Sequence, residues 1–472
     1  MLERLSIKAD GDAAQSALLA TQSANDAANR AARAFWAWSN TSAKDRADLL
    51  AAMAESLAKG RLDLIEIAAQ EVGAAPAWID FNIKIAQDTL HQARDLIPLM
   101  EDKSVKHADG RNSILRRQAV GVVLGFAPWN APVILATRAL AAPIACGNTV
   151  VLKASEHCPN THKMVVDLFC GCGLPENVVS VVTNEATDSL DVARTLIQHP
   201  TIRRINFTGS TRVGQIIAVE AAQVLKRCVL ELSGKAPLIV LDDADLDAAA
   251  AAAMTGAFFN QGQVCMSTER IIVMENIADQ FVEKLVQKTT SLSASDPKIS
   301  TAPLGRLINA GAAARVADLI ADAVAQGARL EHGGQVAGEV MQPAVLDHVT
   351  PAMRIYREES FGPVASVIRV RGIEEAISVA NDTEFGLAAA VFGKDLKRCH
   401  AIADRLESGI CQINGPTVFD DPNMPFGGMK SSGYGRFGGT AALDEFTEIR
   451  WLSQHDRLDA AQIEDMLNLG RT

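Results

Sequence analysis

The chain has 472 residues, of which 48% are apolar and 21% charged, and its formal net charge is -11. This composition is typical of a globular protein of about three domains, and the negative charge argues against nucleic-acid binding. The eight cysteines include no C-x-x-C pair or zinc spacing, so we expect no metal site and a reducing cytoplasm. The N-terminus lacks the apolar core of a signal peptide, and the charge-free window 118–137 is interrupted by prolines, so we expect no membrane span.

The first elements in chain order are helical. Residues 22–97 carry apolar side chains at helical spacing and predict a run of helices, whereas 101–119 turn extended and polar and predict a projecting strand. From residue 120, short β-branched runs alternate with helical segments, which indicates right-handed crossovers in a parallel sheet. The predicted strands are 121–126, 148–153, 178–182, 203–207, 228–232 and 238–241, with helices at 132–144, 161–171, 187–197, 211–224 and 245–258.

A second alternating block follows, with strands predicted at 270–274, 364–370 and 409–414, and then a short strand at 446–452 and a polar helical end. We therefore expect an α/β protein with two doubly wound lobes and a ligand cleft between them. The expected units are 1–100 with 120–233, then 234–445, a small β-element of 101–119 with 446–458, and a tail at 459–472.

The helix at 245–258 leads into FFNQGQVC (258–265), a polar, glycine-bearing turn that ends on Cys265. A thiol reacts only as thiolate, which requires surroundings that lower its pKa. Cys265 is thus a candidate nucleophile, and the alternative is a small buried cysteine.

Four loops follow strand ends, where ligands bind in an open parallel sheet. PWNAP (128–132) contains Asn130, whose amide N–H could stabilise a developing oxyanion. The alternative is an asparagine that only forms the turn. KASE (153–156) offers Lys153 and Glu156 to ribose hydroxyls, or as a surface ion pair.

The other two loops are FTGSTRVG (207–214) and ELSGKAP (231–237). The first opens a helix with glycines and is either a phosphate site or a tight turn. The second begins with Glu231, which is a candidate general base or an ion-pair partner.

Together with EESFGP (358–363) and MPFGGMKSSGYGR (424–436), these motifs resemble the NAD(P)-dependent aldehyde dehydrogenase superfamily in order and spacing. Runs such as RRINFTGSTRVG, LIVLDDAD and RIYREESFGPV are most similar to salicylaldehyde, benzaldehyde and vanillin dehydrogenases of aromatic catabolism.

The resemblance implies a role for each matched residue. Cys265 corresponds to the nucleophile, Glu231 to the base that activates the hydrolytic water, and Asn130 with the Cys265 N–H to the oxyanion hole. By the same resemblance, the first lobe is expected to be a cofactor-binding domain, the second a catalytic domain and the small β-element an oligomerisation element. This implies a homodimer or homotetramer. The residues implied in cofactor binding are Lys153 and Glu156 at the adenosine ribose, Gly209 and Ser210 at the pyrophosphate, Glu359 and Phe361 at the nicotinamide, and Trp129 in the wall.

The expected reaction is oxidation of an aromatic aldehyde to the acid through a hemithioacetal and a thioester. NAD is expected over NADP, which would bind more weakly, because Glu156 would repel a 2′-phosphate. Ala131, Ile134 and Arg138 lie on one face of the helix after PWN, and this face is expected to line the substrate passage with Phe259 and Phe426. Arg138 would stack on a substrate ring or hydrogen-bond an oxygen on it, unless it forms a structural ion pair.

Three departures from the family pattern stand out. Phe437 occupies the place of a glutamate that assists the base in many relatives, so Glu231 is expected to act alone. The family's first strand pair is barely discernible in residues 1–20, and residues after Leu458 extend past the usual end.

Three other readings stay open. The substrate could be a small aliphatic aldehyde or semialdehyde, oxidised by the same mechanism. A CoA-acylating enzyme would use Cys265 but not need Glu231. A non-catalytic relative would be expected to lack Cys265 or Asn130, and both are here.

Overall fold

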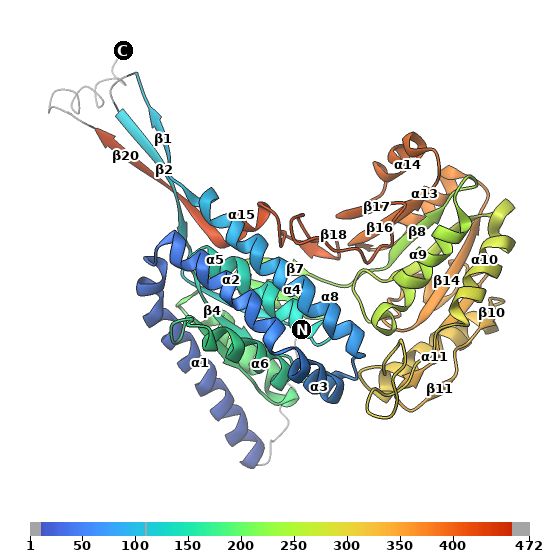
Figure 1. The fold of residues 1–472 in the computed structure, drawn as a ribbon, viewed down its shortest axis with the longest axis horizontal. Helices are drawn as coiled ribbons and strands as arrows, with labels where there is room; N and C mark the ends of the chain where they lie inside the picture. The colour runs from blue at the N-terminus through green and yellow to red at the C-terminus, as the bar shows by residue number, and fades with distance from the viewer. Residues whose placement is uncertain (1–10, 109–110, 456–472) are drawn as a thin grey trace.

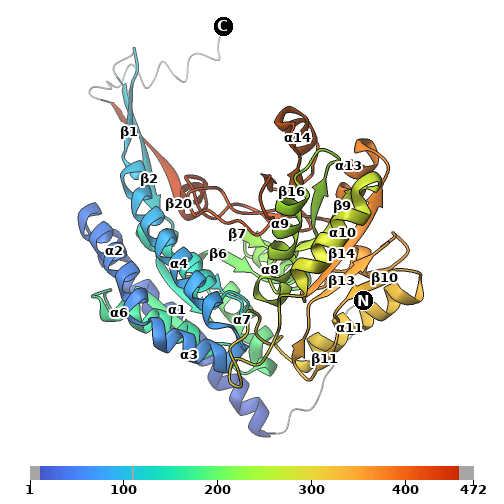
Figure 2. The same cartoon turned by 45° about the vertical axis from the view of Figure 1, so that its right-hand side comes forward.

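The computed structural model describes residues 11–108 and 111–455 and shows two α/β lobes with a strand arm projecting from the first (Figure 1). The first lobe, drawn blue to green, lies beside the second, drawn yellow to orange, in both views (Figure 2). The expected α/β class with parallel sheets is confirmed. The predicted polar helical end and the tail at 459–472 lie outside the described residues.

The predicted N-terminal run of helices is α1 (Gly11–Ser39), α2 (Ala43–Lys59), α3 (Arg61–Val72) and α4 (Pro76–Leu96), followed by the 3-10 turn η1 (Ile97–Met100). Ser42 begins α2 by accepting a hydrogen bond from the Asp45 N–H, and α3 ends at Gly73, whose φ of 66° suits a helix C-terminus. Residues 11–20 form no strand pair: they contain no β-branched residue and belong to α1.

The first lobe is built on a six-stranded sheet in the order β19-β7-β6-β3-β4-β5, parallel except for β19. Its strands are β3 (Val122–Phe126), β4 (Thr149–Lys153), β5 (Val179–Val182), β6 (Ile202–Thr208), β7 (Arg227–Glu231) and β19 (Gly433–Tyr434). Its helices are α5 (Pro132–Ala145), α6 (Pro159–Gly171), η2 (Ala186–Asp188), α7 (Ser189–Gln198) and α8 (Thr211–Gln223). Neighbouring strand residues enter different cores: Val123 belongs to the cluster that contains residues of α2, α4, α5 and α6, and Leu124 to the cluster that contains residues of α1, α7 and α8.

The second lobe has a seven-stranded sheet in the order β10-β13-β14-β9-β8-β16-β17. Its strands are β8 (Ala236–Val240), β9 (Thr268–Met274), β10 (Arg329–His332), β13 (Ala344–Asp347), β14 (Val364–Val370), β16 (Ala388–Phe392) and β17 (Ile410–Ile413). Its helices are α9 (Leu246–Phe258), η3 (Phe259–Gly262), α10 (Glu275–Thr289), α11 (Ala310–Ala325), α12 (Arg354–Arg357), α13 (Ile373–Asn381) and α14 (Leu396–Ala403). The short strands β11 (Val336–Ala337), β12 (Val340–Met341), β15 (Phe385–Gly386) and β18 (Met429–Lys430) form two small ribbons.

Several strands of the second lobe were not predicted. The strand β16, next to the edge strand β17, begins with three alanines, which favour a helix, but these residues are almost fully buried between β8 and β17. Tertiary burial overrides the local preference there. The edge strand β10 is largely exposed and has no apolar alternation for sequence reading to detect.

The projecting arm is a three-stranded antiparallel sheet of β1 (Lys103–Lys106), β2 (Arg111–Ala119) and β20 (Thr447–His455). Ile449 and Trp451 are more than half exposed on this arm. The short helix α15 (Ala441–Phe446) precedes β20, and its Phe446 lies in the first-lobe core. Across the described residues, no helix combines the length and apolar character needed to cross a membrane.

Candidate active site

Cys265 follows a tight turn whose backbone is held in an unusual conformation. Asn260, Gln261 and Gly262 have φ values of 49°, 57° and 70°, which are rare for side-chain-bearing residues. A Cβ on Gly262 would lie 2.2 Å from the Gly362 carbonyl oxygen, so the turn needs glycine there. Asn260 Nδ2 donates to the Asn130 carbonyl at 2.9 Å and ties this turn to the PWN loop.

The turn presents Cys265 to a cavity of about 280 Å³ between the two lobes. A Cβ on Gly234 would lie 2.2 Å from the Cys265 carbonyl oxygen, so the loop after β7 approaches the nucleophile turn closely. The cavity brings together most of the residues expected from the sequence. Its lining is Pro128, Trp129, Asn130, Thr208, Gly209, Ser210, Glu231, Leu232, Ser233, Cys265, Arg315, Glu359 and Phe361.

Glu231 lies at the end of β7 with 1% of its surface exposed. Burial raises the pKa of its carboxyl group to about 7, opposed by interaction with the Cys265 thiol and by the charge of Arg138. Among the described residues, none donates a hydrogen bond to Glu231 Oε1. A buried carboxylate that has one oxygen free of donors and titrates near neutrality is suited to take a proton.

Cys265 keeps partial exposure to the cavity. Burial, followed by the neighbouring charge of Glu231, raises the pKa of the thiol well above its ordinary value. The thiol is therefore protonated at neutral pH in the free protein, and it needs a base beside it to become a nucleophile. Glu231 is the carboxylate in that position.

Asn130 is buried and firmly held beside the nucleophile turn. Its carbonyl accepts hydrogen bonds from Trp78 Nε1 and Asn260 Nδ2, both at 2.9 Å, and its own Nδ2 donates to the Gln263 carbonyl at 2.9 Å. An amide carries two N–H groups, and this bond uses one of them. Trp78 was not predicted, because nothing in α4 indicates contact with a loop 52 residues later.

Trp129 and Phe361 line the cavity and meet edge to face, with ring centroids 5.8 Å apart and planes at 86°. The Glu359 carboxylate accepts the Gly234 N–H at 2.9 Å. Burial, followed by repulsion from Glu269, raises the pKa of Glu359 to about 7. Arg315, which was not predicted, donates to the carbonyls of Glu359 and Ser360 at 3.0 and 2.6 Å.

Lys153 and Glu156 line no part of this cavity. They form an ion pair at the end of β4, and Glu156 also accepts from the Ser189 hydroxyl and borders a surface hollow with Asn184 and Asp188. Burial raises the Glu156 pKa, but the Lys153 charge and these hydrogen bonds outweigh it and lower the pKa overall.

This arrangement fits an extended dinucleotide. The strands β4, β3, β6 and β7 are adjacent and parallel, so the loops at their carboxyl ends share one edge of the sheet. Ser210 caps α8 by accepting from the Val213 N–H at 3.4 Å, which places a helix N-terminus suited to phosphate at the cavity. Lys153 and Glu156 would hold the ribose at one end, and Glu359 and Phe361 the nicotinamide at the other.

The predicted substrate residues lie in two places. Ala131 and Ile134 are buried on α5, while Phe259 packs against Trp78 and Phe81 with ring centroids 4.7 and 5.0 Å apart. The last two residues, Arg138 and Phe426, line a second cavity of about 20 Å³.

Arg138 forms the ion pair that the sequence analysis left open as an alternative. Its Nη2 lies 2.5 Å from Asp420 Oδ2, both side chains are 9% exposed, and the guanidinium sits 4.1 Å from the Phe426 ring centroid. Asp420 was not predicted, because no motif marks it. The Arg138 charge still reaches the site, since it lowers the pKa values of Glu231 and Cys265.

Among the described residues, no group of three or more His, Cys, Asp or Glu side chains is placed to hold a metal ion.

The profile of the aldehyde dehydrogenase family matches residues 8–452. The chain belongs to the aldehyde dehydrogenase family. It is 50% identical over 433 residues to a vanillin dehydrogenase of Pseudomonas fluorescens, covering 92% of this chain and 90% of that one. It is 45% identical over 429 residues to a salicylaldehyde dehydrogenase of Pseudomonas putida, covering 90% and 89%. A crystal structure of a salicylaldehyde dehydrogenase from Pseudomonas putida, complexed with salicylaldehyde, superposes with a TM-score of 0.91 at 43% identity, covering 93% and 91%.

The resemblance inferred from the motifs is thus confirmed, and so is the expectation of an enzyme that oxidises an aldehyde. Aldehyde dehydrogenases use NAD or NADP as hydride acceptor. The similarity to vanillin and salicylaldehyde dehydrogenases supports oxidation of an aromatic aldehyde.

Proposed function

We propose that this aldehyde dehydrogenase oxidises an aromatic aldehyde of the salicylaldehyde, benzaldehyde or vanillin type to its carboxylic acid with NAD, using Cys265 as nucleophile and Glu231 as base. The observation that carries the mechanism is that the Cys265 thiol and the buried Glu231 carboxylate line one cavity, with Glu231 Oε1 accepting no hydrogen bond among the described residues. Burial raises the pKa of this carboxyl group to about 7. A base that titrates near the working pH is the most effective proton acceptor.

In the first half-reaction, Cys265 Sγ bonds to the aldehyde carbon while its proton passes to Glu231. The carbonyl oxygen becomes an oxyanion, which the Asn130 amide and the Cys265 N–H would stabilise. Because Asn130 is fixed by its bonds to Trp78, Asn260 and Gln263, its amide is preorganised for this role. The nicotinamide, held by Glu359 and Phe361, would supply the hydride acceptor when bound.

Loss of hydride leaves a thioester on Cys265, and the second half-reaction hydrolyses it. Glu231 first releases the Cys265 proton to solvent and then takes a proton from water, while the hydroxyl bonds to the thioester carbon. The carbon–sulfur bond breaks, and the thiolate takes that second proton back from Glu231. The products are the carboxylic acid and the free thiol. Phe437, in place of the family's assisting glutamate, leaves Glu231 to act alone, as proposed from the sequence.

The aromatic substrate class is supported by the two most informative relatives and by Ala131, a small residue at the start of α5. Arg138 is proposed to favour oxygen-substituted rings. Its pairing with Asp420 and Phe426 orients the guanidinium without removing all five of its donors. The alternative, a small aliphatic aldehyde or semialdehyde, uses the same chemistry and differs only in this region.

The proposed preference for NAD rests on Glu156. Its carboxylate is held by Lys153 and Ser189, and its pKa is lowered, so it is negatively charged where the ribose would bind. A 2′-phosphate would meet a like charge at close range. Lys153 softens this repulsion, so NADP is proposed as a weaker cofactor.

Assembly and location complete the proposal. The exposed Ile449 and Trp451 on the arm support a homodimer or homotetramer, since apolar side chains on a projecting sheet are usually covered by a partner. The cytoplasmic location stays a prediction from cysteine usage and the N-terminal sequence.

The decisive experiment is a substrate panel of vanillin, salicylaldehyde, benzaldehyde and succinate semialdehyde with NAD and NADP, following reduced cofactor by absorbance. We expect kcat/KM at least tenfold higher for an aromatic aldehyde with NAD than for the semialdehyde. Added CoA should leave the rate unchanged. A preference for the semialdehyde, or a requirement for CoA, would overturn the proposed substrate class or the hydrolytic step respectively.

A further inference from the structure

Glu269, at the start of β9 and four residues after Cys265, is a buried carboxylate that no motif singled out. It is 3% exposed and accepts the Ser360 N–H at 2.8 Å, the Ser360 hydroxyl at 2.7 Å and the Phe361 N–H at 3.0 Å. All these donors belong to the segment that carries Glu359 and Phe361. A carboxylate that accepts several N–H bonds fixes the backbone that offers them.

The segment it holds is not relaxed. Phe361 has a φ of 45°, in the left-handed region that an aromatic residue rarely adopts, so its surroundings must maintain that backbone. Glu269 holds the N–H groups of Ser360 and Phe361, and Arg315 holds the carbonyls of Glu359 and Ser360. The segment is therefore fixed on both its donor and its acceptor sides.

Lys235 balances the buried charge. Its amine pairs with Glu269, and its side chain is fully buried. Lys235 directly follows Gly234, whose N–H donates to the Glu359 carboxylate at 2.9 Å. The ion pair thus joins the loop that begins at Glu231 to the segment that carries Glu359.

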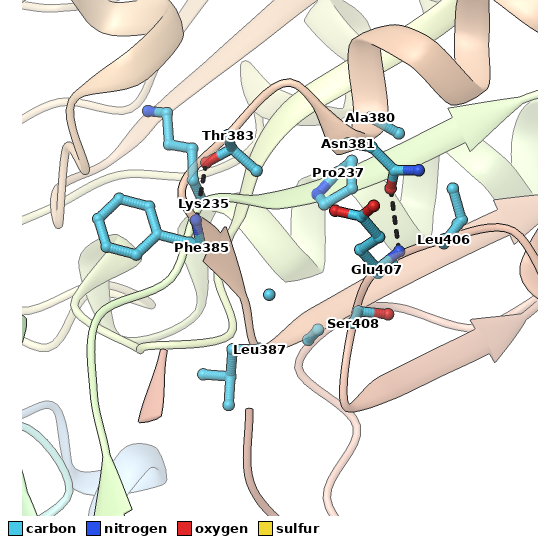
Figure 3. Close-up of a pocket in the computed structure, with 13 residues that line it drawn as sticks. Lys235, Pro237, Ala380, Asn381, Thr383, Phe385, Leu387, Leu406, Glu407 and Ser408 are labelled. Carbon is cyan, nitrogen blue, oxygen red and sulfur yellow. Dashed lines mark hydrogen bonds between the residues drawn. The ribbon is translucent and has the colours of Figure 1, made fainter. Parts of the chain in front are cut away.

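Lys235 also lines a cavity of about 10 Å³, but this cavity does not explain why a charged side chain is buried here. Figure 3 shows the Lys235 amine directed away from Leu406 and Glu407, on the far wall of that cavity. The space suits roughly one water molecule. The charged end of Lys235 serves Glu269 instead.

We propose that Glu269, neutralised by Lys235, is a positioning residue that fixes Glu359 and Phe361 for the nicotinamide end of the cofactor. It touches none of the reacting atoms, and it acts through the segment it holds. The proposal rests on the cofactor site of the proposed function. It separates Glu269 from Cys265 and Glu231, because the hydrogen bonds that Glu269 accepts come from Lys235 and from the 360–361 segment.

That separation gives the test. Cys265 and Glu231 should hydrolyse an activated aryl ester without any hydride acceptor. Acyl transfer from the ester to Cys265 forms a thioester with no oxidation, and Glu231 then activates the water that hydrolyses it. In Glu269→Gln, we expect KM for NAD to rise at least tenfold and kcat for aldehyde oxidation to fall, while 4-nitrophenyl acetate hydrolysis stays within about twofold of wild type. NAD affinity, measured by calorimetry on the full-length variant and on wild type, should be weaker in the variant by a similar factor.

Two further variants test whether the effect is specific to the Glu269 contacts. Ser360→Ala removes one of the bonds but keeps the ion pair, so it should fold and raise KM for NAD by a smaller factor, about threefold. Glu358→Gln is the matched control, because Glu358 is exposed, pairs with Arg354 at 2.8 Å and precedes Glu359 directly, so KM should not change.

Equal losses of oxidation and ester hydrolysis in Glu269→Gln and Ser360→Ala would show a merely structural role and overturn the proposal. So would an unchanged KM for NAD in both. If wild type hydrolyses the ester but oxidises no aldehyde with either dinucleotide, the proposed function fails instead. The positioning role of Glu269 then fails with it, because that role requires a bound dinucleotide.

Discussion

Glu231→Gln should make the protein more stable while inactivating it, with a pH dependence set by the buried carboxyl group. The native pKa of Glu231 is raised from 4.5 to about 7 because the group is buried. Between these values the unfolded chain releases the proton and the native protein keeps it, so the free energy of unfolding falls as pH rises. The penalty is complete above about pH 7 and amounts to about 3 kcal/mol.

Glutamine has the same shape and cannot ionise, so it escapes this penalty. At pH 8 we expect Glu231→Gln to exceed wild type in unfolding free energy by up to about 3 kcal/mol, and near pH 4.5 the two should be equal. Such a gain on losing an active-site charge is a familiar trade between stability and activity. Glu358→Gln is the control, because an exposed ion pair contributes about 1 kcal/mol or less at either pH.

The measurement is urea unfolding of both variants and wild type at pH 5 and pH 8, followed by circular dichroism and compared through midpoints, since two lobes need not unfold in one step. The reasoning is refuted if Glu231→Gln is less stable than wild type at pH 8. It is also refuted if the variant gains equally at both pH values, because the gain would then come from packing rather than from ionisation.

Three further predictions concern activity. Cys265→Ala should abolish aldehyde oxidation and leave NAD affinity within about twofold; more than a trace of turnover would assign the nucleophile elsewhere. In wild type, kcat/KM for the aldehyde should rise roughly tenfold from pH 6 to pH 8 as Glu231, with its pKa of about 7, ionises. Glu231→Gln should release at most one NADH per site and then stall. A flat wild-type profile or a steady rate in the variant would contradict this. Arg138→Leu should lower kcat/KM for salicylaldehyde about tenfold more than for benzaldehyde, the effect of roughly 1.5 kcal/mol or more from a charge-assisted hydrogen bond; equal losses on both substrates would leave Arg138 as the structural partner of Asp420.

The sequence predicted the parts of the site that local patterns announce. Asn130, Gly209 and Glu231 each follow a β-branched run, and the ends of adjacent parallel strands must meet, so sequence alone could place them together. The turn before Cys265 was visible from its glycine and polar residues. Its left-handed asparagine and glutamine were not, because neither residue type requires that conformation.

The residues that were missed contact partners that lie far from them along the sequence. Trp78 reaches Asn130 from a helix in another part of the chain, and Asp420 reaches Arg138 across 282 positions. Arg315 and Glu269 bond mainly to backbone atoms of a neighbouring loop, and a backbone partner leaves no mark in the sequence. Periodicity finds buried faces, but only the folded chain decides which buried charges meet.

The antiparallel strand β19 has a consequence for the order in which the protein is made. Gly433 pairs with Glu231, and the Ser432 carbonyl accepts the Leu232 N–H, so the edge that holds the proposed base is supplied from near the C-terminus. At about 5–20 residues per second, a ribosome needs roughly 10–40 s after Glu231 to synthesise that edge. During that time the N-terminal sheet waits with β7 as an open edge, available to other chains. A nascent chain stalled before residue 433 would therefore carry an intact Cys265 and Glu231 but no finished site, and it would be a substrate for chaperones rather than a smaller enzyme.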